Sequence, residues 1–166
     1  SFLLRQGKPA NDVALYLPTS DAWASLAPGR VDLHRALGER LGPDVVARIL
    51  DAGYNLDFFD DGALEQMRAN RYKIVILPGV ERIPESSYRK LREFAQSGGA
   101  LVATRRRPGL APGFLATPAD HARIREISAT LPHFVEDEAQ LGARLAALVR
   151  PDVALTPPAP EIGVVH

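Results

Sequence analysis

The segment 73–77 is the feature that most constrains the fold of this chain. After Lys73 its residues are Ile74-Val75-Ile76-Leu77, all apolar and mostly β-branched, and Pro78-Gly79 then ends the run. A strand that lacks an alternating polar face has to be buried on both sides, as the strands of parallel sheets are. The chain is therefore expected to cover both faces of one sheet with helices.

Further short apolar runs predict strands at residues 12–17, 55–59 and 100–104. Helical patterns are predicted at 32–41, 43–53, 64–69 and 84–98, and from about residues 118 and 137 onward, whereas 19–30 is predicted to be a polar loop. Alternation of strand and helix requires right-handed parallel crossovers. We therefore predict an α/β fold, a flavodoxin-like three-layer sandwich with a mostly parallel sheet.

The length of 166 residues, 46% of them apolar, suits one substantial hydrophobic core. We expect this domain to span residues 12–150. Residues 1–11 are expected to be a linker from a preceding domain. Residues 151–166 are expected to hold an exit strand at 153–155 and a stiff proline-rich linker to a following β-rich domain. The chain is thus expected to be an internal part of a longer protein.

Charge and residue usage exclude several functions. Twenty basic and twenty acidic residues cancel, so the chain lacks the positive field of a nucleic-acid binder, and no apolar run approaches the length that crosses a membrane. The absence of cysteine excludes disulfides, thiolate metal sites and a cysteine nucleophile. The four histidines show no helical pairing that would aim two rings at one metal ion. We expect neither a metal nor a cofactor.

In an open parallel sheet, ligands bind beyond the carboxyl ends of the strands. The loop after the first strand lacks the glycines of a phosphate-binding loop, although the hydroxyls of Thr19 and Ser20 leave a flavodoxin-type phosphate contact open. Asp60 and Asp61 are expected to form a turn. No serine stands on a glycine-flanked strand-to-helix turn. We therefore predict no catalytic residue in this chain.

Four residues are candidates for contact with a substrate: Asp21, Trp23, Arg105 and Arg106. Trp23 is the sole tryptophan and lies in the first ligand-side loop, where it could stack on a sugar, anchor an interface or join the core. Arg105 and Arg106 belong to a run of three arginines beyond the fourth strand. Such a run suits a solvated loop, or contact with a carboxylate, a phosphate or a neighbouring domain.

Several segments also resemble known families. Residues 72–79, 84–94 and 97–102 resemble the class I glutamine amidotransferase-like fold, in the non-catalytic form called the trimerisation-like domain of β-galactosidases. More narrowly, residues 3–9, 12–18 and 21–23 resemble the internal domain of family 106 α-L-rhamnosidases, and 162–166 resemble the start of the β-rich region that follows it. Amidotransfer is excluded, because its cysteine nucleophile is missing.

The resemblance implies a non-catalytic accessory and scaffolding domain of a glycoside hydrolase. That family places the paired carboxylates and a calcium site in a barrel that precedes this domain. The domain would brace the barrel and could line the rim of the sugar site, so its partners would be neighbouring domains of the same polypeptide and a carbohydrate. The parent enzyme would be secreted or periplasmic. Two alternatives stay open: a module that binds a flavin or a phosphorylated metabolite, and an oligomerisation domain.

Overall fold

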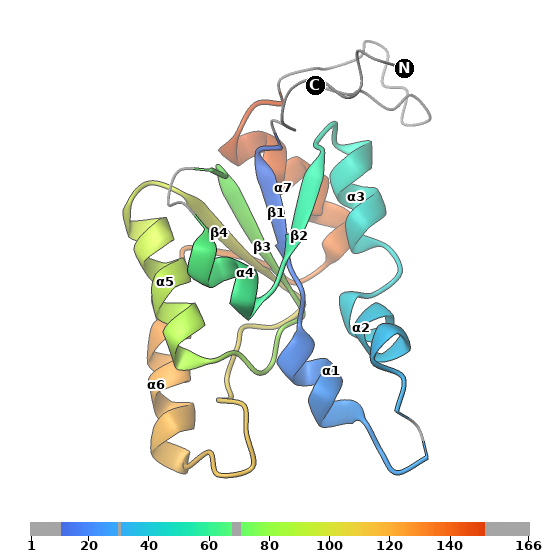
Figure 1. Cartoon of the computed structure of the whole chain (residues 1–166). Coiled ribbons are helices and arrows are strands. Elements are labelled where there is room, and N and C mark those ends of the chain that lie inside the picture. Colours follow the sequence, from blue (N-terminus) through green and yellow to red (C-terminus); the bar gives the residue numbers. More distant parts are fainter. Residues whose placement is uncertain (1–10, 30, 68–70, 152–166) are drawn as a thin grey trace.

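Five parallel strands form one sheet in the computed structural model, which describes residues 11–29, 31–67 and 71–151 (Figure 1). The strands are β1 (Val13–Tyr16), β2 (Leu56–Phe59), β3 (Ile74–Pro78), β4 (Ala100–Thr104) and β5 (His133–Val135). They lie in the order β2-β1-β3-β4-β5, and every neighbouring pair is parallel. This is the strand order of doubly wound, flavodoxin-like proteins. The predicted α/β three-layer fold is thus confirmed.

Helices cover both faces of the sheet (Figure 1). The α4 (Asp61–Gln66), α5 (Glu85–Gln96) and α6 (Pro118–Ala129) helices lie on one side, and α2 (Leu33–Leu41), α3 (Val45–Asp51) and α7 (Leu141–Leu148) lie on the other. The short α1 helix (Thr19–Ser25) follows β1 at the carboxyl end of the sheet and packs against α2. Within the described part of the chain, no helix is long and apolar enough to cross a membrane.

The central strands supply both halves of the core. In β1, Ala14 and Tyr16 point into the core under α5 and α6, whereas Val13 and Leu15 point into the core under α3 and α7. Successive side chains of a strand face opposite sides, and β3 divides its residues in the same way. Every residue of β1 and β3 is buried, which explains why their sequences lack a polar face.

Two elements of the structure are absent from the sequence-based prediction. The predicted polar loop 19–30 begins with α1, whose seven residues bury little besides Asp21 and Ala22 and therefore carry no apolar stripe. The β5 strand was not predicted, because it has three residues and only Val135 is buried. Both elements are stabilised by tertiary contacts rather than by local pattern. The exit strand predicted at 153–155 lies outside the described residues.

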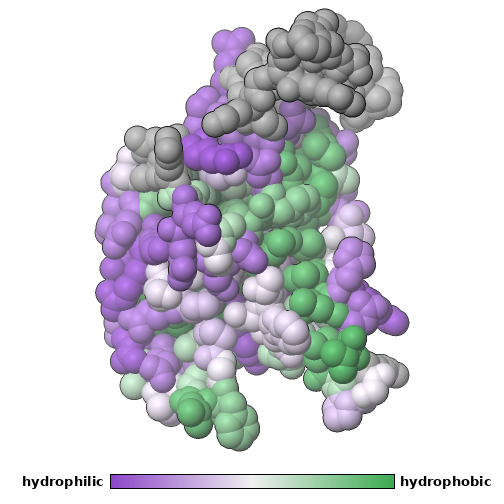
Figure 2. Space-filling model, in the orientation of Figure 1, coloured by the Kyte–Doolittle hydropathy of each residue, from purple (hydrophilic) through white to green (hydrophobic). Residues whose placement is uncertain are grey.

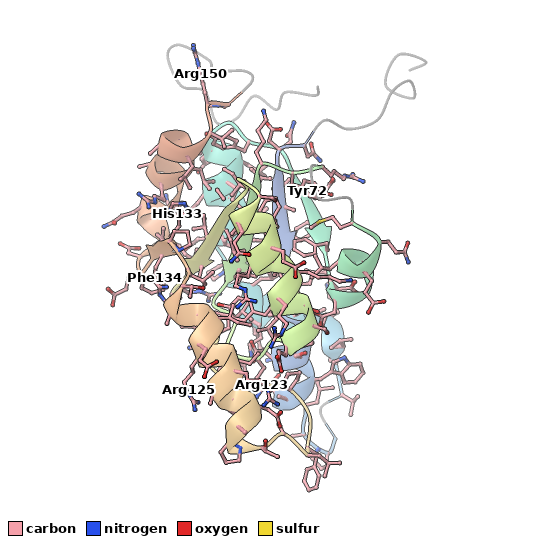
Figure 3. The ribbon with its side chains drawn as sticks, turned by 90° about the vertical axis from the view of Figure 1, so that its left-hand side faces the viewer. Tyr72, Arg123, Arg125, His133, Phe134 and Arg150 are labelled. Atoms are coloured by element: carbon pink, nitrogen blue, oxygen red, sulfur yellow. The ribbon has the colours of Figure 1, made fainter. Side chains whose placement is uncertain are left out.

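Ion pairs join α5 and α6, which lie on the same face of the sheet. Glu85 at the start of α5 accepts hydrogen bonds from Arg89 of the same helix and from Arg123 of α6, each at 2.8 Å. Figure 3 shows Arg123 on the side of α6 nearest α5, with Arg125 on the other side. These two arginine partners lower the pKa of the Glu85 carboxyl group. Since both arginines are about half exposed and Glu85 is partly exposed, the network fixes the packing geometry more than it adds stability.

Leu77 and Leu50 provide a matched test of this core. Leu77 in β3 is fully buried, whereas Leu50 in α3 is 48% exposed. Leu77→Ala is expected to lower the free energy of unfolding by about 2 to 5 kcal/mol, because it leaves a cavity in close-packed surroundings. Leu50→Ala is expected to change it by less than about 1 kcal/mol. Urea denaturation measures both, and equal effects would contradict the assignment of these faces.

The His133 imidazole at the start of β5 makes folding depend on pH. Its burial, and then the guanidinium of Arg144, whose Nη2 lies 2.8 Å from His133 Nδ1, lower the pKa of His133 below its ordinary value of 6.5 (Figure 3). The unfolded chain therefore binds this proton more readily than the folded chain does. The contribution of His133 to stability is complete above about pH 6.5 and decreases as the pH falls from there towards the folded-state pKa. We expect His133→Gln to reduce the loss of stability between about pH 7.5 and about pH 5.5, as measured by urea midpoints.

Candidate functional site

The loops that follow β1, β3, β4 and β5 meet at the carboxyl end of the sheet, at the bottom of Figure 1. In the sheet, β2 lies on one side of β1 and β3 lies on the other, so the connections from β1 to β2 and from β2 to β3 run in opposite directions along the sheet. In folds of this strand order, ligands bind in the crevice between the carboxyl ends of β1 and β3. Two segments border this crevice. They are the first turn of α1 and residues 79–84, named here the 79–84 loop.

Asp21 is a buried acidic residue beside this crevice. It lies in the first turn of α1 and is 1% exposed. Its carboxylate accepts the backbone N–H groups of Glu81 at 2.7 Å and Arg82 at 3.0 Å, and the Arg82 guanidinium at 3.3 Å. A buried carboxylate requires such donors, because an unpaired charge is costly away from water. Asp21 therefore fastens α1 to the 79–84 loop, and its contact with a substrate stays a prediction.

Arg105 holds the carboxyl end of α2. Its Nη2 donates to the backbone oxygens of Arg40 at 2.7 Å and Leu41 at 2.9 Å. Its Nε also lies 3.1 Å from Glu138, which accepts a hydrogen bond from the Thr104 hydroxyl at 2.6 Å. The last carbonyls of a helix lack partners within the helix, and a cation there also opposes the negative end of the helix dipole.

The backbone around Arg105 is shaped for this contact. Arg105 itself has a φ of 59°, which is unusual for a residue other than glycine. Gly79 has a φ of 58°, and a Cβ atom at that position would lie 2.6 Å from Arg105 Nη2. Only glycine both adopts this conformation readily and leaves room for the guanidinium. The Pro78-Gly79 pair that ends β3 therefore makes space for Arg105.

Arg107 likewise binds the carboxyl end of a helix, α6, on the opposite side of the sheet. Its Nη1 donates to the backbone oxygens of Ser128 at 2.8 Å and Leu131 at 2.9 Å, at the carboxyl end of α6. The guanidinium also lies 5.3 Å from the centre of the Phe134 ring, which is a cation–π geometry (Figure 3). Two of the three consecutive arginines thus have structural partners, and describing the run as a solvated loop is incomplete.

Arg106 differs from its two neighbours. Its side chain is 54% exposed, and its Nη1 lies 3.9 Å from Glu81 in a loose ion pair. Glu81 binds Arg82 more closely, at 2.7 Å. Of the two candidate arginines, Arg106 therefore presents more of its guanidinium to an incoming ligand, whereas Arg105 is engaged with α2.

The two aspartates after β2 also have partners within the chain. Asp60 accepts the backbone N–H of Ala63 at 2.8 Å and caps α4. Asp61 accepts a hydrogen bond from the Tyr16 hydroxyl at 2.8 Å. Burial and this carboxylate together raise the pKa of Tyr16 well above its ordinary range. The predicted turn at Asp60 and Asp61 is thus the beginning of a helix.

An open pocket of about 660 Å³ lies between α1 and the loop 109–116. Trp23 projects from α1 at its edge and is 59% exposed. The pocket is lined by α1, by the 79–84 loop, by the 109–116 loop and by α6. The lining residues are Ser20, Trp23, Ala24, Arg82, Leu110, Ala111, Pro112, Gly113, Phe114, Ala116 and His121. Figure 2 shows hydrophobic residues gathered at this lower end of the molecule. The structure thus places Trp23 in a mixed apolar and polar hollow.

Backbone hydrogen bonds fix the walls of this pocket. The backbone oxygen of Glu81 accepts hydrogen bonds from the backbone N–H groups of Gly109 and Leu110, each at 3.0 Å. The backbone N–H of Ile83 donates to the backbone oxygen of Leu110 at 3.1 Å. The Ala111 N–H donates to His121 Nδ1 at 3.0 Å. The 79–84 loop therefore connects α1, through Asp21, to the 109–116 loop.

Sequence reasoning found Trp23 but missed Arg82, His121 and the 109–116 loop. The signal for the loop was present in Phe114-Leu115, an apolar pair within a stretch rich in proline and glycine. No sequence pattern pointed to Arg82 or His121, since they meet Trp23 only through the strand order. Among the described residues, no three histidine, aspartate or glutamate side chains gather as a metal site would require.

No protein-family model and no curated protein sequence matches the chain. Several solved structures are similar to it, among them two β-galactosidases. One is a β-galactosidase from Bifidobacterium adolescentis, with 23% identity and a TM-score of 0.49 over 72% of this chain and 54% of that chain. The other is Gan42B, a GH42 β-galactosidase, with 20% identity and a TM-score of 0.46 over 72% of this chain and 17% of that chain.

The chain thus spans about half the length of the first of these proteins and about a sixth of the second. At this level of similarity, the two structures identify neither a substrate nor a reaction for this chain.

Arg105 and Arg106 can be compared directly, since they are adjacent and identical in type. Arg105→Ala removes charge-assisted bonds to two helix carbonyls and is expected to lower the free energy of unfolding by about 1 to 3 kcal/mol. Arg106→Ala is expected to change it by no more than about 0.5 kcal/mol. Urea denaturation of both variants checks this expectation, and a larger loss in the Arg106 variant would refute the assigned roles.

Proposed function

We propose that this chain is a non-catalytic accessory domain of a glycoside hydrolase, similar to the internal domain of family 106 α-L-rhamnosidases. The observation that carries the proposal is that carboxylates at the carboxyl end of the sheet are bonded to other groups of the chain. Five of them, Asp21, Asp60, Asp61, Glu81 and Glu138, accept hydrogen bonds or form ion pairs within the chain. Glycosidic bond cleavage needs two carboxyl groups that face a sugar from opposite sides. These five are committed to holding loops and helices.

The sequence resemblance to the rhamnosidase domain supports the same proposal. Its segments at 12–18 and 21–23 correspond to β1, the following turn and the start of α1, which border the crevice. In this proposal the domain braces a catalytic barrel of the same polypeptide. Trp23 and Arg106 are its exposed rim residues, and Asp21 and Arg105 support the rim from behind. The parent enzyme is secreted or periplasmic.

A flavin or phosphorylated metabolite fits this crevice less well. The hydroxyl-bearing residues Thr19 and Ser20 lie in the first turn of α1, as a phosphate loop would require, but the Asp21 carboxylate is buried beside them. A phosphate group would bring a second negative charge towards it. In the 79–84 loop, the backbone N–H groups of Glu81 and Arg82 could bind a phosphate, but they already donate hydrogen bonds to Asp21.

Hydrolysis assays test the proposal. The chain is expected to release no nitrophenol from 4-nitrophenyl α-L-rhamnopyranoside or 4-nitrophenyl β-D-galactopyranoside, because those five carboxylates are engaged within the chain. The intact polypeptide encoded by the same reading frame is expected to hydrolyse one of them. Turnover by the chain alone would contradict the non-catalytic role, and an intact polypeptide inactive on all glycosides would contradict the enzyme class.

A further inference from the structure

We propose that the pocket between α1 and the 109–116 loop binds a neutral carbohydrate. The inference deepens the proposed function and rests on it for the class of polymer, but the recognition is argued from the pocket itself. Its volume of about 660 Å³ falls within the range of roughly 300 to 1,000 Å³ that small-molecule sites occupy. It is therefore large enough for more than one sugar ring.

The apolar part of the pocket suits the face of a pyranose ring. Trp23 is 59% exposed and Phe114 is fully exposed, and both line the hollow. A pyranose presents C–H groups on its faces and hydroxyl groups around its edge. Stacking such a face on the indole removes apolar surface from water and leaves the hydroxyl groups free to bond.

The polar residues of the pocket supply hydrogen bonds for those hydroxyl groups. His121 Nδ1 accepts the Ala111 N–H, so the neutral imidazole carries its proton on Nε2 and is a donor there. The Arg82 guanidinium bonds to Asp21 and Glu81 through Nη1, and a guanidinium has further donors on Nε and Nη2. Ser20 adds a hydroxyl that both donates and accepts.

The charges around the pocket select a neutral ligand. Arg82, the arginine among the lining residues, is balanced by Asp21 and Glu81, with which it forms ion pairs at 3.3 and 2.7 Å. Two carboxylates beside this guanidinium leave it no excess positive charge with which to attract a phosphate or carboxylate. Sugar hydroxyl groups need no such charge, since they bond to neutral and paired groups alike.

The pocket is also organised before any ligand arrives. Asp21 binds the backbone of the 79–84 loop, and that loop pairs with the 109–116 loop. Three segments distant in the sequence are thus connected behind Trp23. A wall that is already fixed loses little conformational freedom on binding, which favours ligands that offer only a few weak contacts.

Trp23 is the sole tryptophan of the chain, so tryptophan fluorescence, excited selectively over the four tyrosines, reports on this pocket. The chain is titrated with L-rhamnose, D-galactose and neutral oligosaccharides of two to four sugars. A saturable shift of the tryptophan emission is expected for at least one of them, with a dissociation constant in the range of about 0.1 to 10 mM. No shift with any of these saccharides up to about 50 mM would overturn the proposal. Galactose 6-phosphate is the charged control, and a response to it without a response to any neutral sugar would also overturn the proposal.

Phe114 and Leu115 form a matched pair of variants. Both side chains are almost fully exposed, but Phe114 lines the pocket and Leu115 does not. Phe114→Ala is expected to weaken saccharide binding at least about fivefold, and Leu115→Ala is expected to leave it within about twofold. Equal weakening would point to a general apolar surface and overturn the proposal. An emission shift that depends on protein concentration without sugar, with a doubled mass in light scattering, would overturn it as well, since a second copy would then occupy the pocket.

These outcomes are separate from the test of the proposed function. A chain that binds no sugar and hydrolyses no glycoside keeps its accessory role and loses only the binding site. A chain that hydrolyses a glycoside loses the accessory role, whether or not Trp23 responds to sugars.

Discussion

The last carbonyl groups of a helix have no hydrogen-bond partner within the helix. In this protein, one loop supplies arginine partners to the carbonyl groups at the ends of two helices on opposite faces of the sheet. Arg105 binds the end of α2, and Arg107 binds the end of α6. Both arginines follow β4 directly, so the positions of the two helices are tied to a strand inside the sheet. The room for Arg105 comes from Gly79 at the end of the neighbouring strand. The three layers are thereby joined at the end where ligands bind in related topologies.

This use of polar residues has a functional consequence. The carboxyl end of a parallel sheet collects polar side chains, and enzymes of similar topology use them on a substrate. Here Asp21, Glu138 and Arg105 are instead bonded to the protein. These three side chains therefore serve the packing of the loops and helices at this end of the sheet. Trp23, Arg106 and the tip of the 109–116 loop lie outside this network and are exposed.

The fold could be predicted from the sequence further than the site could. The apolar runs at 12–17, 73–77 and 100–104 became β1, β3 and β4, because strands buried on both faces carry their signal in almost every residue. The β2 strand was also predicted, from its apolar residues beside a turn, although only Phe59 of its four residues is buried. The β5 strand and α1 were missed, since each buries only one or two side chains and depends on its neighbours. At the site, Trp23 was found because of its chemistry alone. Arg82 and His121 could not be found, because what brings them to Trp23 is the order of the strands and the path of two loops.

The spacing of Arg105 and Arg107 has a consequence for variation in length. The two residues reach helix ends on opposite faces, and one residue separates them. Inserting or deleting a residue there would leave at least one of the two helix ends without its cation. The 109–116 loop is held by backbone bonds at Gly109, Leu110 and Ala111, whereas its tip at Gly113 to Leu115 is exposed. Related chains should therefore keep the length of the first segment and vary in the tip of the second, so that differences in what each relative recognises accumulate at the tip.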